Sequence, residues 1–160
     1  MNLKDITVNT FQVLATDQEL LDLLEIPLTD VGGVPTRTMR SIRDQIIEDK
    51  YPSDLVDNNL SRLCVYELQS HPTSNRIVEK GNIEIDIYVT KEKNKADRRT
   101  LVVAERLISL LDNEKRKLTG LAPVGVGTGL QYNSRLANMQ TDSREWVKYG
   151  LVFNYDLIRI

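Results

Sequence analysis

Hydrophobic and polar residues alternate most regularly in two stretches of the second half of the chain. Between Asn82 and Thr90 every second residue is apolar, namely Ile83, Ile85, Ile87 and Val89, and the residues between them include Glu84, Asp86 and Tyr88. Trp146–Ile160 repeats the pattern, with one face formed by Val147, Tyr149, Leu151, Phe153, Tyr155 and Leu157. A period of two predicts strands with one buried and one solvated face, which favours an antiparallel sheet.

The first sixty residues carry patterns that are mainly helical. The spacing of Ile6, Thr10, Val13 and Leu14 predicts a helix over residues 3–15. Residues 16–19 have the form of a capping box, with Thr16 and Glu19, and predict the start of a short leucine-rich helix that ends at Pro27. Residues 30–35 predict a loop by their composition, and apolar residues three and four apart favour a helix within Thr36–Lys50.

The middle of the chain predicts a hairpin followed by a helix. Arg62–Gln69 has apolar residues on both faces, which suits a central strand, and Ser70–Lys80 reads as a polar connection to the next strand. The charged segment Thr90–Arg99 then leads into the strongest helical pattern. The apolar stripe of this helix consists of Leu101, Ala104, Ile108 and Leu111 and is widened by Val103, Leu107 and Leu110. We expect the core to contain Ile85, Ile87, Leu101, Ile108, Leu151 and Phe153.

These elements predict an α/β protein of the α+β class. Their order is α-α-(α)-β-β-α-β-β, and about four strands form a small antiparallel sheet packed by helices. The length of 160 residues suits a single domain over residues 1–160. Within it, residues 1–60 form a helical part and residues 61–160 a part made of the sheet and its helix.

Composition narrows the classes of function. The formal net charge of −2 argues against a general nucleic-acid binder, which usually carries a basic excess. No stretch has the length and apolar character of a membrane span, and the N-terminus lacks the pattern of a signal peptide. The single cysteine, Cys64, excludes an internal disulfide framework and suits synthesis in a reducing cytoplasm.

No combination of residues predicts catalysis, a metal site or a cofactor. Gly125–Gly129 lacks the glycine spacing and the following helix of a dinucleotide fingerprint, so we interpret it as a flexible loop. The only histidine, His71, lies in a polar connection, and Cys64 lies in a strand, where a small buried hydrophobe is expected. Glu84 and Asp86 share the face that we expect to be solvated.

The charged segment supplies the candidate contacts with a partner. It contains Lys91, Lys93, Lys95, Arg98 and Arg99, which outnumber Glu92 and Asp97. Such a run is usually a solvated loop before a helix. The functional alternative is a contact with an acidic protein surface or with a phosphate backbone. No aromatic residue lies among these cations to stack on bases, which counts against single-stranded nucleic acid.

The arrangement resembles the tail terminator or tail-completion proteins of long-tailed bacteriophages. The resemblance rests on the strands Leu63–Gln69, Gly81–Val89 and Trp146–Phe153, and on the long helix between the second and third of them. It covers most of Arg62–Ile160 and depends on length, element order and the aromatic-rich final strand. It implies a small α/β unit with an antiparallel sheet flanked by helices.

The resemblance also implies a function as a virion structural protein. Such proteins assemble as a ring, commonly a hexamer, that caps the tail tube and joins it to the head-side neck or connector. The expected partners are therefore further copies of the chain, the tail tube protein and a connector protein. DNA would pass through the ring without specific binding, and no membrane contact is implied.

Three alternatives stay open at this point. The chain could be another neck protein, such as a head-completion or adaptor protein. It could instead be a small cytoplasmic enzyme or nucleotide-binding protein that uses Gly125–Gly129. It could also bind nucleic acid through Lys91–Arg99.

Overall fold

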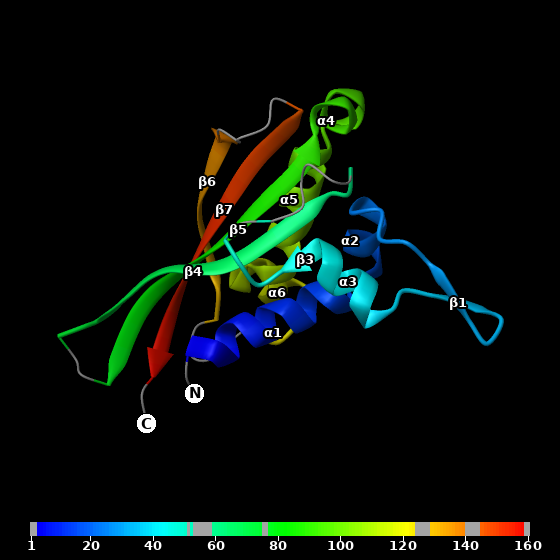
Figure 1. Cartoon of the computed structure of the whole chain (residues 1–160). Helices are drawn as coiled ribbons and strands as arrows, with labels where there is room; N and C mark the ends of the chain where they lie inside the picture. Colours follow the sequence, from blue (N-terminus) through cyan, green and yellow to red (C-terminus); the bar gives the residue numbers. More distant parts are fainter. Residues whose placement is uncertain are drawn as a thin grey trace.

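The protein folds into a five-stranded sheet with helices gathered on one of its faces, and a separate two-stranded hairpin projects from this body (Figure 1). The computed structural model describes residues 3–50, 52, 59–74, 77–123, 129–139 and 145–158. Mixed helix and strand content in this arrangement confirms the expected α+β class. Most of the glycine-rich segment, residues 125–128, lies outside the described residues.

The sheet has five strands in the order β3-β4-β5-β7-β6. Four of them are long and antiparallel to their neighbours, namely β4 (Arg62–Pro72), β5 (Val78–Thr90), β7 (Trp146–Ile158) and β6 (Gln131–Met139). The fifth, β3 (Ile46–Ile47), is short and runs parallel to β4. The four predicted strands are therefore confirmed, and β4 is an interior strand as its two apolar faces indicated.

The β4–β5 hairpin is longer than the sequence predicted. Pairing continues from Arg62 opposite Tyr88 to Pro72 opposite Glu79. His71 accordingly lies in β4 opposite Lys80, although we placed it in a connection. The interpretation of Ser70–Lys80 as a polar connection was wrong for most of its length, because polar side chains are compatible with strands that extend beyond the core. In Figure 1 this end of the hairpin extends past the helices.

The core lies between the sheet and three helices, α1 (Leu3–Thr16), α2 (Gln18–Leu23) and α5 (Arg99–Leu111). From the sheet, the side chains buried in it include Leu63, Val65, Ile83, Ile85, Ile87, Val89, Tyr149, Leu151, Phe153 and Tyr155. From the helices they include Ile6, Phe11, Leu14, Leu20, Leu21, Val103, Ala104, Leu107 and Leu111. None of the helices in the described part of the chain has the length and apolar character that crossing a membrane requires.

The buried face of α5 differs slightly from the apolar stripe that we predicted. Val103, Ala104, Leu107 and Leu111 are buried against the sheet. Ile108 is only partly buried, and Leu101 is 37% exposed. The expectation that Leu101 is a core residue was therefore wrong, because Thr100 and Val103 face the packed surface in the first turn of α5 and Leu101 lies on its exposed side.

Helix α2 is started by Asp17 and not by the predicted capping box. Asp17 Oδ1 accepts a hydrogen bond from the backbone N–H of Leu20 at 2.8 Å, whereas the Thr16 hydroxyl donates back to the carbonyl of Gln12. Arg106 of α5 also binds both oxygens of Asp17, at 2.9 and 2.5 Å. One carboxylate therefore both caps α2 and attaches it to α5.

Residues 29–36 form a hairpin where we expected a loop. Its strands are β1 (Thr29–Val31) and β2 (Val34–Thr36), with Val31 opposite Val34. Gly32 and Gly33 have φ values of +61° and +85°, which a two-residue hairpin turn of this hand requires. Asp30 accepts a hydrogen bond from the N–H of Gly33 at 2.7 Å and closes the turn.

Three shorter helices complete the described chain. Helix α3 (Met39–Gln45) begins at the cap Thr38 and covers only part of the helix predicted within Thr36–Lys50. Helix α4 (Lys91–Asp97) occupies the segment interpreted as a charged connection, and α6 (Asn113–Leu118) follows α5. The N–H of Lys93 donates to the Thr90 hydroxyl, so a side-chain cap starts α4 where charge density suggested a loop.

Phe153 provides a direct test of the packing. Its side chain is fully buried and lies edge-on to the ring of Tyr132, with the ring centroids 5.9 Å apart. Phe153→Ala should lower the free energy of unfolding by about 3–5 kcal/mol, measured by urea denaturation, because it leaves a cavity in the core. Leu118→Ala is the control, since Leu118 is exposed, and should leave stability nearly unchanged. Equal effects of the two substitutions would contradict the packing described here.

Candidate functional site

The sheet face that lacks α1, α2 and α5 carries a buried polar cluster. Glu84 is 3% exposed and Asp86 is fully buried, so the expectation that they lie on a solvated face was wrong. Cys64, Tyr88 and Trp146 form a small apolar group on this face, with Ile47 and Tyr66 packed against it. These large side chains exclude water from the carboxylates between them. We call Tyr66, Glu84, Asp86, Tyr88 and Lys148 the polar cluster.

Asp86 is at the centre of the polar cluster. Its Oδ2 accepts a hydrogen bond from the hydroxyl of Tyr66 at 2.8 Å and lies 3.2 Å from Nζ of Lys148. The ammonium of Lys148 is also 5.6 Å from the ring centre of Tyr88. In the register of the sheet Tyr66 lies opposite Glu84, and Lys148 lies opposite Tyr88. Both side chains therefore reach Asp86 diagonally from the neighbouring strands.

The environment favours the protonated form of Glu84. Burial, followed by the hydrogen bond with Asp86 and the negative charge of that residue, raises the pKa of Glu84 to about 7, while Tyr66 and Lys148 oppose the shift. Two carboxyl groups on one side of a strand repel each other when both are ionised. Glu84 therefore carries a proton near neutral pH, beside the ion pair that Asp86 forms with Lys148.

The same environment also raises the pKa values of three neighbours of Asp86, namely Lys148, Tyr66 and Cys64. Burial lowers the pKa of Lys148, but attraction to Asp86 and Tyr88 outweighs it, so that pKa lies above its ordinary value. Burial, followed by hydrogen bonds with Glu84 and Asp86, raises the pKa of Tyr66. Burial, followed by the charge of Asp86, raises the pKa of the Cys64 thiol to about 12. The thiol is thus a poor nucleophile, and its predicted burial in a strand is confirmed.

The polar cluster can hold a proton but offers no arrangement for nucleophilic chemistry. Glu84 Oε1 and Asp86 Oδ1 are buried and accept no hydrogen bond from the residues that the structure describes. Across the described ranges no three residues of the His, Cys, Asp and Glu types are grouped so as to hold a metal ion. His71 is exposed in β4, away from this group. The cluster consists of contacts that join β4, β5 and β7 and of a carboxyl group, Glu84, whose pKa is raised.

The five predicted contact residues divide into two kinds. Lys93 forms an ion pair with Glu25, which follows α2. Arg99 binds Asp97 Oδ2 at 2.7 Å, the carbonyl of Leu23 at 2.7 Å and Glu25 Oε1 at 3.7 Å. These two cations join the start of α5 and the helix α4 to the end of α2, so their charge serves the fold.

Lys91, Lys95 and Arg98 are the other kind. All three are exposed, and their side chains make no hydrogen bond or ion pair with the described part of the chain. Arg98 has a φ of +54°, at the corner where α4 ends and α5 begins. Thr100 closes this corner by donating its N–H and its hydroxyl to Asn94 Oδ1. The corner thus holds the Arg98 side chain outward.

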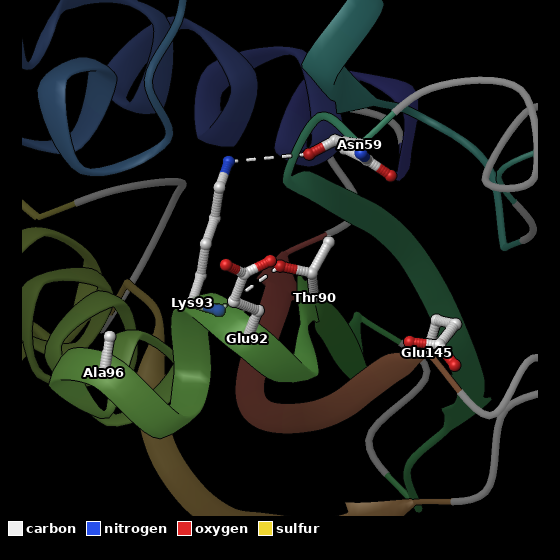
Figure 2. A pocket seen from close by; sticks show the side chains of 6 residues that line it. All are labelled: Asn59, Thr90, Glu92, Lys93, Ala96 and Glu145. Atoms are coloured by element: carbon white, nitrogen blue, oxygen red, sulfur yellow. Dashed lines mark hydrogen bonds between the residues drawn. The ribbon is translucent and has the colours of Figure 1, made fainter.

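A hollow of about 440 Å³ lies beside α4 (Figure 2). Lys93 spans it, with Nζ 3.5 Å from the carbonyl oxygen of Asn59, and Glu92 and Glu145 lie along its wall. Thr90 faces the hollow, but its hydroxyl accepts the N–H of Lys93 as the helix cap. The lining side chains that the structure describes form no pairing of a nucleophile with a base, and we assign no reaction to this hollow.

Sequence reasoning missed the polar cluster, although one signal pointed to it. Apolar residues on both faces of β4 indicated a strand buried on both sides, and the same argument applies to its neighbour β5. The face of β5 and β7 that turns away from the helices carries three large side chains, Tyr88, Trp146 and Val152, and all three are buried. Large side chains on the same strand face as Glu84 and Asp86 could have indicated that these two carboxylates are buried.

Comparison with known proteins identifies the family. Residues 17–154 match the family model described as YomW, which covers most of the chain. The chain therefore belongs to the YomW family, which is associated with bacteriophages. No curated protein matches the chain significantly.

The polar cluster predicts that the stability of the fold decreases as the pH rises from 4.5 to about 7. The folded state holds more protons than the unfolded state between the ordinary pKa of Glu84, 4.5, and its folded value of about 7. The contribution of Glu84 to stability is therefore complete below pH 4.5 and is lost as the pH rises through about 7. Glu84→Gln, which does not titrate, should remove a change on the order of 1–3 kcal/mol across this interval.

Thermal melts of the wild type and of Glu84→Gln between these two pH values measure the difference. Glu105→Gln is the matched control, because Glu105 is exposed on α5 and should leave the wild-type profile in place. Parallel profiles for the wild type and Glu84→Gln would show that Glu84 does not hold a proton in the folded protein.

Proposed function

From its membership of a phage-associated family, we propose that this protein is a tail terminator. In this proposal it forms a ring, of six copies, that caps the tail tube and joins it to the head-side connector in the virion. DNA passes through the ring without sequence-specific contact. The observation that carries the proposal is the match of residues 17–154 to the YomW family, together with the resemblance in element order.

The fold supports the proposal at the level of architecture. The resemblance implied a small unit with an antiparallel sheet flanked by helices, and the chain has four long antiparallel strands with α1, α2 and α5 on one face. A ring needs surfaces that contact copies and neighbours while the sheet keeps its shape. The edge strand β6 and the exposed cations of α4 are surfaces of this kind.

Deletion of the gene from the phage tests the function. A tail terminator stops growth of the tube, so infected cells lacking it should contain over-long tails that are not attached to heads. Electron micrographs of the lysate and supply of the protein from a plasmid complete the experiment. Tails of normal length beside filled, unattached heads would instead assign the chain to another neck component. Normal virions would exclude both roles.

The cations of α4 supply a more local test. The double change Lys91→Glu and Lys95→Glu should leave the melting temperature within a few degrees, because neither side chain has a partner in the described fold. It should nevertheless give over-long or headless tails if these cations contact an acidic surface of the tube or connector. Lys115→Glu with Lys117→Glu on α6 is the control of equal charge and should give normal virions.

Reversal of Lys93 or Arg99 is not informative about partners. Both cations bind within the fold, so their loss is expected to lower stability and to confuse the readout. If the double variant at Lys91 and Lys95 gives normal virions, these two cations do not contact the tube or the connector. That result would leave the proposed ring untested by this experiment but not contradicted.

A further inference from the structure

The β1–β2 hairpin exposes apolar side chains away from the body of the protein. Figure 1 shows it projecting beyond α2 and α3. Val31 is 54% and Val34 61% exposed, and Leu28 and Met39 beside the hairpin are also exposed. Val31 and Val34 are cross-strand partners, so their side chains share one face of the hairpin. We call residues 28–36 the arm.

The arm has little support from its own chain. All six residues of β1 and β2 are exposed, and the two strands pair only with each other among the described strands. An isolated two-stranded hairpin is marginally stable in water, and exposed apolar side chains on it add a cost that docking would remove. Both features are typical of a segment that packs against another surface.

A groove of about 320 Å³ near the opposite edge of the sheet can receive it. Leu101 of α5 and Val147 and Tyr149 of β7 contribute its apolar surface. Arg98, at the corner before α5, and Arg135 of the edge strand β6 supply its charge, and no carboxylate is among its described lining residues. The exposed position of Leu101, which a core residue would not have, places it in this groove.

The charges of the two surfaces are complementary. Asp30 is the only charged residue of the arm, and its carboxylate has no cation as partner among the described residues. Arg98 and Arg135 likewise have exposed side chains without a carboxylate partner in the described fold. An apolar arm with one negative charge therefore matches an apolar groove with two positive charges.

The two surfaces cannot meet within one copy as folded. The arm leads into α3 and β3, at one edge of the sheet, whereas the groove includes β6, the strand at the other edge. Figure 1 shows the arm and β6 on opposite sides of the molecule. The arm therefore does not fill the groove of its own chain.

We propose that the arm of one copy docks into this groove of the next copy, with Val31 and Val34 against the apolar lining and Asp30 toward Arg98 and Arg135. Two different surfaces on every chain form a head-to-tail interface, which closes into a ring when the rotation permits. This inference rests on the proposed ring and names the contact between its subunits.

Cysteine cross-linking tests the contact on the purified full-length protein. Asp30→Cys and Arg135→Cys are made in separate chains, mixed at high concentration and oxidised in air. The native Cys64 is buried and its pKa is raised, so it should not compete. We expect covalent dimers from the mixture and a ladder of larger species from a chain carrying both substitutions. The control mixture of Asp30→Cys with Leu118→Cys should give no covalent dimer between the two substituted chains.

Substitutions measure the same contact without a covalent bond. Val34→Asp should weaken self-association about tenfold or more in sedimentation equilibrium, because it places a charge in the apolar part of the interface. Asp30→Arg and Arg135→Asp should each weaken it, and the chain carrying both should regain part of the loss. Leu118→Asp, a similar change at an exposed leucine of α6, should have no effect.

The outcomes separate this inference from the proposed function. Oligomers that form no cross-link between the two substituted positions and that tolerate Val34→Asp would overturn the arm contact and leave the ring in place. A protein that stays monomeric and unlinked at high concentration would also overturn the arm contact, whatever the gene deletion shows. Cross-linked ladders from a phage whose deletion leaves tails normal would support the arm contact and reject the tail terminator.

Discussion

The rest of the structure depends on the burial of β5 on both faces. One face supplies Ile83, Ile85 and Ile87 to the core under α1 and α5, and the other places Glu84 and Asp86 beneath aromatic side chains. A carboxylate in such a position destabilises the fold unless it is paired and hydrogen-bonded. Lys148 from β7 and Tyr66 from β4 meet that requirement from both neighbours. A shift of either strand by one residue would break these bonds, so the polar cluster specifies the register that the core also needs.

The sequence predicted the strands well and their environment less well. Alternation locates β5 and β7 because a period of two follows from backbone geometry alone. Whether the polar face meets water depends on side chains of neighbouring strands, which no local pattern contains. Glu84 shows the consequence, since the residue that looked most solvated is 3% exposed and has a raised pKa. The candidate contacts show it as well, because the pairing of Lys93 and Arg99 with Glu25 joins segments far apart in the sequence.

The remaining differences also have physical causes. Glycines and a proline made residues 30–35 look like a loop, yet Gly32 and Gly33 are what a tight hairpin turn needs, and Pro35 is tolerated in a strand that lacks a further neighbour. Dense charge made residues 91–97 look unstructured, yet Thr90 caps a helix whose cations bind back to the body or point outward. In both cases the composition correctly indicated that the segment is exposed. It did not indicate that the segment forms regular secondary structure.

The two edges of the sheet differ, and this difference bears on assembly. At one edge β3 pairs over only two residues, and the chain reaches it from the projecting arm through α3. At the other edge β6 pairs only with β7 among the described strands and presents exposed side chains, including Arg135. An open edge of this kind is normally protected by charge or by a partner. The proposed docking of the arm would use these unlike edges, because it joins a segment that projects from one edge to a groove beside the other, and a contact between two different surfaces is head-to-tail.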